Sequence, residues 1–106
     1  MIGIDVVDLS RIKEDPAFIR HVLTEEEQEE LARRGSKQRR IEYIGGRFAV
    51  KEALFKATGR RDALRCSVLN DASGKPYIKD HPEFSVSISH DGGSAAAVVE
   101  VAQNDE

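Results

Sequence analysis

The fold of this chain is decided by residues 45–59, which read Gly-Gly-Arg-Phe-Ala-Val-Lys-Glu-Ala-Leu-Phe-Lys-Ala-Thr-Gly. We predict one long helix that starts after a cap at Ser36 and ends at Gly59. At about 100° per residue, one apolar arc of about 60° forms along this helix. It contains Ile41, Ile44, Phe48 and Phe55, and the opposite side carries Val50, Ala53 and Leu54. Apolar residues on both sides predict that much of the helix is buried.

Glu52 interrupts this pattern, because it lies at the edge of the apolar arc. A buried carboxylate without a partner is costly, so we expect a cationic group to meet it. An ion pair with Lys51 or with Lys56, which has the favourable helical spacing, is one explanation. A bound metal ion is the other. The pair Gly45-Gly46 inside the helix predicts the close approach of another backbone or of a ligand.

The remaining elements are predicted from alternation and from capping residues. Asp15-Pro16 and the capping box from Thr24 to Glu27 each begin a helix, and the second of these helices ends at Gly35. Strands are predicted at 2–7, 66–70, 75–78, 84–89 and 95–101, with a loop at 90–94 and a tail at 103–106. We therefore predict a single α+β domain over residues 1–106, in which a mostly antiparallel sheet packs on the long central helix.

Composition restricts the function classes. The chain has 106 residues, of which 40% are hydrophobic and 33% are charged, and its net charge is −3. This charge argues against general nucleic-acid binding. No apolar run is long enough to cross a membrane, and the N-terminal segment has the features of neither a signal nor a transit peptide. Cys66 is the only cysteine, so an internal disulfide is excluded and a cysteine-based zinc site is not expected. We expect a cytoplasmic protein.

The charged residues are segregated along the chain. One acidic block covers residues 25–30, a basic block covers 33–40, and a second basic group consists of Arg60, Arg61 and Arg65. Solvated helix faces are the ordinary explanation for such runs. A landing surface for an acidic partner or a phosphate is the functional one.

A small set of residues has the chemistry for catalysis. Asp5 interrupts the apolar first strand. Together with Glu52 it favours a hard cation such as Mg²⁺, which takes few protein ligands and completes its shell with water and phosphate oxygens. Ser89, His90 and Asp91 are consecutive and cannot form a hydrolase triad, because neighbouring strand residues point to opposite faces. The residues alone predict a Mg²⁺-dependent phosphoryl-transfer type of site.

Four motifs in order give a more specific identification. They are Gly3-Ile4-Asp5-Val6-Val7-Asp8, Gly46-Arg47-Phe48-Ala49-Val50-Lys51-Glu52-Ala53, Gly74-Lys75-Pro76 and Val86-Ser87-Ile88-Ser89-His90. In this order and at this length, the chain resembles the holo-[acyl-carrier-protein] synthases, the small 4′-phosphopantetheinyl transferases. The resemblance implies the fold of that family and transfer of the 4′-phosphopantetheine arm of coenzyme A to a serine of an apo acyl carrier protein, with release of adenosine 3′,5′-bisphosphate.

The resemblance also implies roles for individual residues. Asp5 and Glu52 match the Mg²⁺ ligands, and Glu52, Lys56 and His90 match catalytic positions. The residues implied to contact coenzyme A are Arg47, Lys56, Gly74, Lys75, Pro76, His90 and Asp91. Arg11 and the helix after it match the region that docks the carrier. A homotrimer with active sites between subunits is implied as well. A metal-activated water, Glu52 or His90 remains open as the group that deprotonates the serine.

Two departures from the family pattern mark this chain. Asp91 stands where threonine or serine is common, and Arg60-Arg61-Asp62 replaces a glycine-containing, phosphate-cradling step. Two rival functions remain. One is a non-catalytic coenzyme A or nucleotide-binding module of the same fold, and the other is an interaction domain whose basic patches dock an acidic helix.

Overall fold

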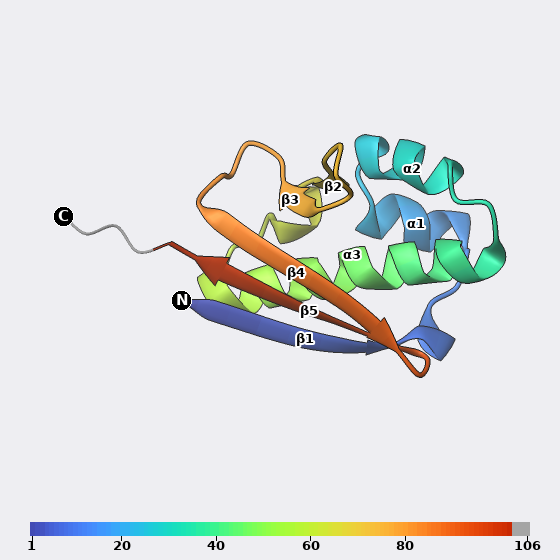
Figure 1. Ribbon diagram of the computed structural model, residues 1–106, viewed down its shortest axis with the longest axis horizontal. Helices are drawn as coiled ribbons and strands as arrows, with labels where there is room; N and C mark the ends of the chain where they lie inside the picture. The colour runs from blue at the N-terminus through green and yellow to red at the C-terminus, as the bar shows by residue number, and fades with distance from the viewer. Residues whose placement is uncertain (103–106) are drawn as a thin grey trace.

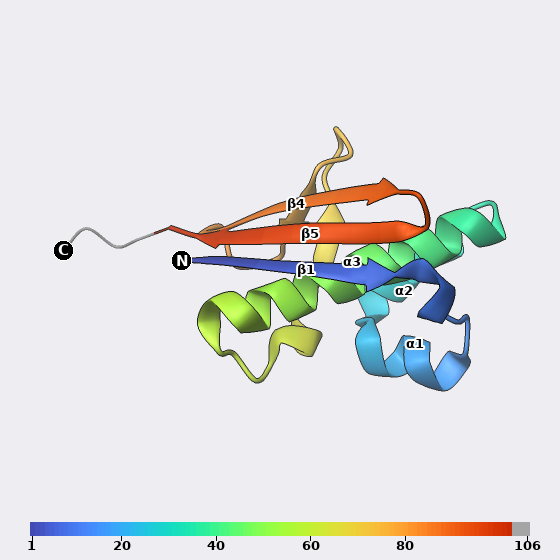
Figure 2. The ribbon, with the colours of Figure 1, turned by 90° about the horizontal axis from the view of Figure 1, so that it is seen from below.

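The protein is described by a computed structural model that covers residues 1–102, and the predicted tail at 103–106 lies outside the described residues. A long helix, α3 (Lys37–Thr58), runs through the molecule beneath a sheet of three strands (Figure 1). The shorter helices α1 (Pro16–Val22) and α2 (Glu25–Ala32) precede it. Figure 2 shows α1 below α3, away from the three-stranded sheet. The long central helix therefore packs against the three-stranded sheet on one side and against α1 on another.

The boundaries of α3 follow the residues that predicted them. The Ser36 hydroxyl accepts a hydrogen bond from the Arg39 N–H at 3.1 Å, which caps the first turn. Gly59 has a φ of 70° and donates its N–H to Phe55 O at 2.7 Å. The helix therefore ends at a left-handed residue. The capping box at Thr24 and Glu27 is also present, although α2 ends at Ala32, before Gly35. The predicted starts of α2 and α3 are confirmed.

Two antiparallel sheets contain all five strands of the described region. The larger one has the order β1 (Ile2–Asp8), β5 (Ser94–Val101), β4 (Phe84–Asp91). The smaller one pairs β2 (Val68–Asn70) with β3 (Pro76–Ile78). The predicted α+β class with an antiparallel sheet on a central helix is confirmed.

The predicted loop at 90–94 is wrong, because β4 continues through His90 and Asp91. The turn contains only Gly92 and Gly93, which both have positive φ, at 56° and 83°. Two-residue turns of this kind match the twist of the flanking strands, and glycine adopts them without steric cost. Asp91 therefore pairs directly with Ser94 in the ladder.

The first strand lies unusually close to α3. A Cβ atom on Gly3 would lie 1.9 Å from Ala53 O, so only glycine permits this contact. Earlier along α3, a Cβ on Gly45 would lie 2.4 Å from Leu9 Cδ2, and one on Gly46 would lie 3.2 Å from Ile88 Cγ2. Other groups do approach this pair closely, but they are side chains and not the backbone or the ligand that the sequence predicted.

Most of the predicted apolar positions of α3 are buried, among them Ile44, Val50, Ala53 and Leu54. Phe55 departs from the prediction, since it remains 50% exposed. The helix pattern shows which residues share a side, and the extent of the covering elements decides which of them are buried. None of the helices in residues 1–102 combines the length and the apolar character needed to span a membrane.

The outer face of the larger sheet carries an uncovered apolar row along β1 and at one position of β5. Ile2, Ile4 and Val6 of β1 are 66%, 58% and 64% exposed, and Val98, which pairs with Ile4, is 37% exposed. Alternate residues of β1 point inward, so this outer row follows directly from strand geometry. A contiguous exposed apolar face of this kind marks an interaction surface.

Candidate functional site

Two predicted site residues meet where β1 crosses α3. Asp5 faces inward from β1 and its side chain is 16% exposed. The Lys56 ammonium donates hydrogen bonds to Asp5 Oδ1 at 3.0 Å and to Ile4 O at 3.2 Å. The Asp5 carboxylate is therefore mostly buried, and the Lys56 ammonium is the group that neutralises its charge. The close contact at Gly3 holds these two side chains in register.

Glu52 lies one helical turn before Lys56 and is half-buried. It lines a cavity of about 370 Å³ that also contains Asp5 and Arg11. Apolar side chains, including Phe18 and Phe48, form another part of the wall. We name this the carboxylate cavity. It brings together the two predicted metal ligands and the predicted docking residue.

Neither of the ion pairs considered for Glu52 forms. Lys56 binds Asp5, and Lys51 binds Glu27 at 2.5 Å. Among the hydrogen bonds and ion pairs of residues 1–102, none involves the Glu52 side chain. The ion-pair explanation is therefore wrong, and a half-buried carboxylate without a protein partner in the described chain remains beside Asp5.

Lys51 is fully buried and has a structural role. Its ammonium also donates to Val22 O at 2.6 Å and to Leu64 O at 3.1 Å. Glu27 in turn accepts the N–H groups of Thr24 and Val68, both at 2.8 Å. Burial lowers the pKa of Lys51, and the Glu27 carboxylate opposes that shift. This network fixes α3 against the ends of α1 and α2 and against β2.

A second group of predicted residues lies on another side of α3. His90 and Arg47 line a cavity of about 440 Å³, together with Tyr43 and Asn70. We name this the arginine cavity, because Arg33, Arg34 and Arg39 complete its lining with Glu42. These three arginines belong to the basic block that the sequence offered as a phosphate surface. The sequence did not single out any of them, nor Tyr43 or Asn70.

Arg47 forms the floor of the arginine cavity and is 5% exposed. Its guanidinium donates to Val68 O at 3.0 Å and to Asn70 Oδ1 at 2.6 Å, and it lies 4.0 Å above the Tyr43 ring. Tyr43 donates to Glu30 Oε1 at 2.7 Å, and burial raises its pKa. Arg47 therefore shapes the cavity from below, while the more accessible arginines at the rim are available to an anion.

His90 is held at the edge of the arginine cavity by the backbone of α3. Its Nε2 lies 3.3 Å from Glu42 O, a distance that suits a hydrogen bond from the protonated nitrogen. The absence of a side chain on Gly46 leaves room for the ring, since a Cβ there would lie 3.4 Å from this nitrogen. Gly46 thus allows β4, which carries His90, to pack closely against α3.

The two cavities are separate in one chain. Over residues 1–102 they share no lining residue, and Arg47 and Glu52 are about 140° apart around the helix axis. The structure therefore brings Asp5, Glu52 and Lys56 together, but it does not bring His90 to them.

The other predicted contact residues lie outside both cavities. Gly74, Lys75 and Pro76 belong to the β2–β3 hairpin, which is linked to the arginine cavity by the pairing of Pro76 with Asn70. Asp91 is exposed at the β4–β5 turn. Neither the hairpin nor Asp91 lines the carboxylate cavity.

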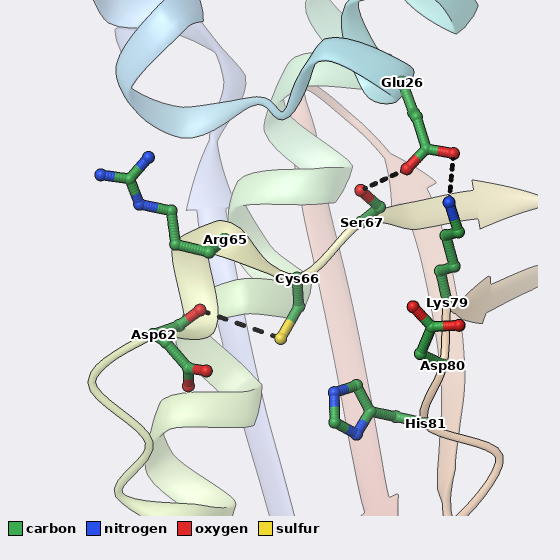
Figure 3. Close-up of a pocket in the computed structure, with 8 residues that line it drawn as sticks. All are labelled: Glu26, Asp62, Arg65, Cys66, Ser67, Lys79, Asp80 and His81. Carbon is green, nitrogen blue, oxygen red and sulfur yellow. Dashed lines mark hydrogen bonds and ion pairs between the residues drawn. The ribbon is translucent and has the colours of Figure 1, made fainter.

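Figure 3 shows a third cavity, of about 240 Å³, that contains none of the predicted site residues. Its residues are Glu26, Asp62, Arg65, Cys66, Ser67, Lys79, Asp80 and His81. Glu26 and Lys79 pair at 2.8 Å, and the Cys66 thiol contacts Asp62 O at 3.8 Å. Burial raises the pKa of Cys66, which makes the thiol a weak nucleophile. We do not assign the chemistry to this cavity.

Comparison with known proteins identifies the fold and the family. The family model described as the 4′-phosphopantetheinyl transferase superfamily matches residues 1–101. The holo-[acyl-carrier-protein] synthase of Halalkalibacterium halodurans is 44% identical, over 92% of this chain and 90% of that protein.

Solved structures agree with this match. The synthase from Neisseria meningitidis has a TM-score of 0.84 at 31% identity, covering 96% of this chain and 97% of that one. A Bacillus anthracis synthase in complex with CoA (3′,5′-ADP) has a TM-score of 0.78 at 37% identity, covering 92% and 91%. The chain described here is thus a member of the 4′-phosphopantetheinyl transferase superfamily.

Proposed function

We propose that this protein is a holo-[acyl-carrier-protein] synthase, which transfers the 4′-phosphopantetheine group of coenzyme A to a serine of an apo acyl carrier protein. The relatives that carry this name cover nearly the whole chain. The observation that carries the proposal is the meeting of Asp5, Glu52 and Lys56 at one place. Two carboxylates and an ammonium suit the transfer of a charged phosphoryl group.

Mg²⁺ is the metal that this donor set fits. Three carboxylates line the carboxylate cavity, those of Asp5, Asp8 and Glu52. Asp8 accepts two hydrogen bonds from Ser10, and no three His, Cys, Asp or Glu side chains in residues 1–102 form a metal-binding group. Asp5 and Glu52 are therefore the two proposed ligands. Mg²⁺ commonly takes one or two carboxylates and fills its remaining positions with water and substrate phosphates. Asp5 and Glu52 would hold the ion. When bound, it neutralises charge on the diphosphate of coenzyme A.

The residues of the chain then have distinct tasks. The serine oxygen attacks the phosphorus that carries the pantetheine arm, the bond to adenosine 3′,5′-bisphosphate breaks, and the serine proton must leave. Glu52 is the proposed acceptor of that proton, because its carboxylate has no protein partner in the described region. Lys56 is held beside Asp5 by two hydrogen bonds and donates to the phosphate oxygens of the leaving group.

The arginine cavity is the proposed site for the nucleotide half of coenzyme A. Arg33, Arg34 and Arg39 line it without an ion-pair partner in the described residues, and guanidinium groups bind phosphates with paired hydrogen bonds. His90 is assigned here as a phosphate contact. The hairpin residues Gly74, Lys75 and Pro76 and the turn residue Asp91 are proposed as outer contacts of the coenzyme.

A homotrimer would unite the two cavities. The exposed apolar row on β1 and β5 supplies an interface, and a cyclic arrangement lets the carboxylate cavity of one copy face the arginine cavity of the next. Each active site would then contain residues from two copies. The proposed reaction takes place in the cytoplasm, where a single reduced cysteine is ordinary.

The direct test is incubation of the protein with coenzyme A, Mg²⁺ and a panel of apo acyl carrier proteins from fatty-acid and polyketide synthesis. We expect the carrier to gain the mass of one phosphopantetheine group, and the gain to disappear with EDTA. Binding of coenzyme A without any mass gain would instead indicate the non-catalytic module.

A further inference from the structure

Arg34 differs from the other arginines at the rim of the arginine cavity. Arg33 and Arg39 are exposed, whereas Arg34 is half-buried. The guanidinium of Arg34 lies 4.7 Å from the centroid of the Tyr43 ring. Within residues 1–102 it takes part in no hydrogen bond and no ion pair, although it lines the cavity. Its N–H donors are therefore left for a ligand.

The ring of Tyr43 is what holds Arg34 in this place. A cation over an aromatic face is attracted by the electrons of the ring, and the planar guanidinium group also stacks on it. Arg47 contacts the same ring, at 4.0 Å from the centroid, but it also donates hydrogen bonds to Val68 O and Asn70 Oδ1. Arg34 has no such second anchor in the described chain, so its orientation depends on the ring.

The ring itself is fixed by a buried polar network. Tyr43 is 4% exposed, and its hydroxyl donates a hydrogen bond to Glu30 Oε1 at 2.7 Å. The other oxygen of that carboxylate accepts the Asn70 N–H at 3.0 Å. Tyr43 is thus tied to α2 and to β2 as well as to its own helix. A side chain with fixed partners is a rigid support for the residue that lies on it.

The lining of the arginine cavity has an excess of positive charge. Four arginines line it, and Glu42 is the only carboxylate among its described lining residues. Glu42 accepts a hydrogen bond from the Gln38 amide at 3.1 Å and forms no ion pair with Arg34 in residues 1–102. A concave site with one sign of charge attracts the opposite sign. Arg34 offers an anion a half-buried guanidinium that is already in position.

The chemistry of coenzyme A indicates which anion this is. In the proposed function, the diphosphate reacts at the carboxylate cavity, which is separate from the arginine cavity within one chain. Coenzyme A has one further phosphate, a monoester on the ribose that stays in the adenosine 3′,5′-bisphosphate product. A phosphate monoester carries nearly two negative charges at neutral pH and has three acceptor oxygens. This ribose phosphate is therefore the group left for the arginine cavity.

We propose that Tyr43 is a positioning residue that, through Arg34, makes the enzyme specific for a coenzyme with a ribose phosphate monoester. The proposal rests on the proposed function, from which the substrate is taken. Tyr43 itself does not touch the coenzyme. It holds the Arg34 side chain in the binding orientation beforehand, so less conformational entropy is lost when the phosphate binds. Dephospho-coenzyme A, which lacks this phosphate, gains nothing from the arrangement.

The test measures the Kd of coenzyme A and of dephospho-coenzyme A without a carrier, so that it does not depend on turnover. The variants are Arg34→Gln, Tyr43→Leu, which removes the ring, and Tyr43→Phe, which keeps it. The double variant Arg34→Gln/Tyr43→Leu completes a double-mutant cycle. Lys37→Gln is the control for a lost charge, since Lys37 is exposed and lines neither the arginine cavity nor the carboxylate cavity.

We expect Arg34→Gln to raise the Kd of coenzyme A roughly tenfold or more, because hydrogen bonds to a charged group are lost. Tyr43→Leu should raise it about fivefold, through loss of the cation–π contact. In the Arg34→Gln background the same change should have less than about a twofold effect, since the residue it acts through is gone. Tyr43→Phe and Lys37→Gln should resemble the wild type.

Two further readouts separate a positioning role from a structural one. The Kd of dephospho-coenzyme A should be nearly the same in all of these proteins. In steady-state transfer, Arg34→Gln and Tyr43→Leu should raise the KM for coenzyme A and leave kcat nearly unchanged, because the reacting groups lie in the carboxylate cavity. Circular dichroism identifies a variant that does not fold. Tyr43→Met, whose flexible side chain fills irregular gaps, then replaces Tyr43→Leu in the cycle.

Three outcomes overturn the inference and leave the proposed function intact. If Tyr43→Leu weakens coenzyme A binding equally with and without Arg34, the ring acts through Arg47 or through the fold. Equal losses for coenzyme A and dephospho-coenzyme A show that Arg34 does not bind the ribose phosphate. A higher KM for the carrier, with both Kd values unchanged, assigns Arg34 to the carrier protein instead. Conversely, the expected Kd pattern in a wild type that modifies no carrier supports the inference and removes the proposed transfer reaction.

Discussion

The Lys56 ammonium lies 3.0 Å from the Asp5 carboxylate, although the two residues are 51 positions apart in the chain. This contact joins α3 to β1 at the point where Gly3 allows the strand to lie against the helix. It also occupies the only lysine that could have paired with Glu52 at the favourable helical spacing. Glu52 is therefore available to a ligand, and its removal gives the sharpest prediction.

Glu52→Gln should reduce phosphopantetheine transfer at least about a hundredfold, the usual effect of removing a group that stabilises charge in a transition state. The free energy of unfolding should change by less than about 1 kcal/mol, because within residues 1–102 the Glu52 side chain has no hydrogen bond or ion pair to lose. The carrier's mass gain and thermal unfolding of the same preparation measure both effects.

The matched control for that substitution is Glu29→Gln, which removes the same charge from an exposed position on α2. It should leave transfer unchanged. Normal turnover in Glu52→Gln would contradict the metal-ligand role, and a large loss of stability would show a structural role.

Gly3→Ala should destabilise the protein by about 3 kcal/mol or more, because the new methyl group meets a backbone oxygen that cannot move aside. Separation of β1 from α3 should also displace Asp5 from Lys56 and lower the affinity for Mg²⁺. Gly35→Ala is the control, since a Cβ there meets nothing within 4 Å. Urea unfolding and Mg²⁺ titration test this, and equal stability of the two variants would disprove the tight contact.

Lys51→Met should cost about 3–5 kcal/mol, because it leaves the buried Glu27 carboxylate without its counter-charge. The double variant Lys51→Met/Glu27→Gln should recover part of this loss, since no uncompensated charge remains and the amide oxygen can still accept a backbone N–H. Chemical denaturation of the wild type, both single variants and the double variant gives the coupling energy. Additive effects would mean that the ion pair contributes little.

The chain's local signals were sufficient for most of the fold. Ser36 and Gly59 bound α3, and the capping box at Thr24 starts α2, because these signals act through hydrogen bonds within a few residues. The β4–β5 turn was placed too broadly because His90 and Asp91 are polar. Polar residues are common in loops, but they also occur at the exposed end of a strand, as His90 and Asp91 do here.

The candidate site was predicted less completely. Asp5, Glu52 and Lys56 were chosen by motif, and the structure brings them together. That Lys51 pairs with Glu27 could not be predicted, because a contact between α3 and α2 depends on how the helices pack. The division of the site into two cavities could not be predicted either, since it depends on which side of α3 each residue faces.

Stability should fall as the pH rises above about 10, the usual pKa of a tyrosine, and Tyr43 should account for part of this loss. Burial raises the pKa of Tyr43 above that of an unfolded tyrosine. Below the unfolded pKa both states are protonated and the stabilising contribution is complete. Above it, the unfolded state releases the proton first, so stability is lost at about 1.4 kcal/mol per pH unit until the folded pKa is reached.

Lys51 has the opposite effect on stability over this alkaline range. Burial lowers its pKa, so the folded state releases the Lys51 proton before the unfolded state does, and stability rises with pH. The measurement is therefore the difference between the wild type and Tyr43→Phe, followed by urea unfolding across the alkaline range. This difference should shrink as the pH rises. Tyr77→Phe, at an exposed position on β3, is the control and should follow the wild type. A difference that is independent of pH would show that Tyr43 ionises equally in both states.

The proposed trimer makes a prediction that would not hold if each active site were formed by a single chain. Glu52→Gln and His90→Ala should each be inactive alone, because each removes one half of every site. If a site combines Glu52 of one copy with His90 of the next, mixed trimers contain some sites in which both halves are intact. For random assembly from equal amounts, about one quarter of the sites should be complete.

Co-expression of the two variants, or their joint refolding from denaturant, prepares the mixed trimers. The specific activity should then recover to about one quarter of the wild-type value, while the variants mixed without subunit exchange should stay inactive. Light scattering confirms the trimer, and Ile4→Glu, which places a charge in the exposed apolar row, should yield inactive monomers. If mixing restores no activity although the subunits exchange, Glu52 and His90 do not share a site across the interface. Activity in monomeric Ile4→Glu would show that one chain is sufficient.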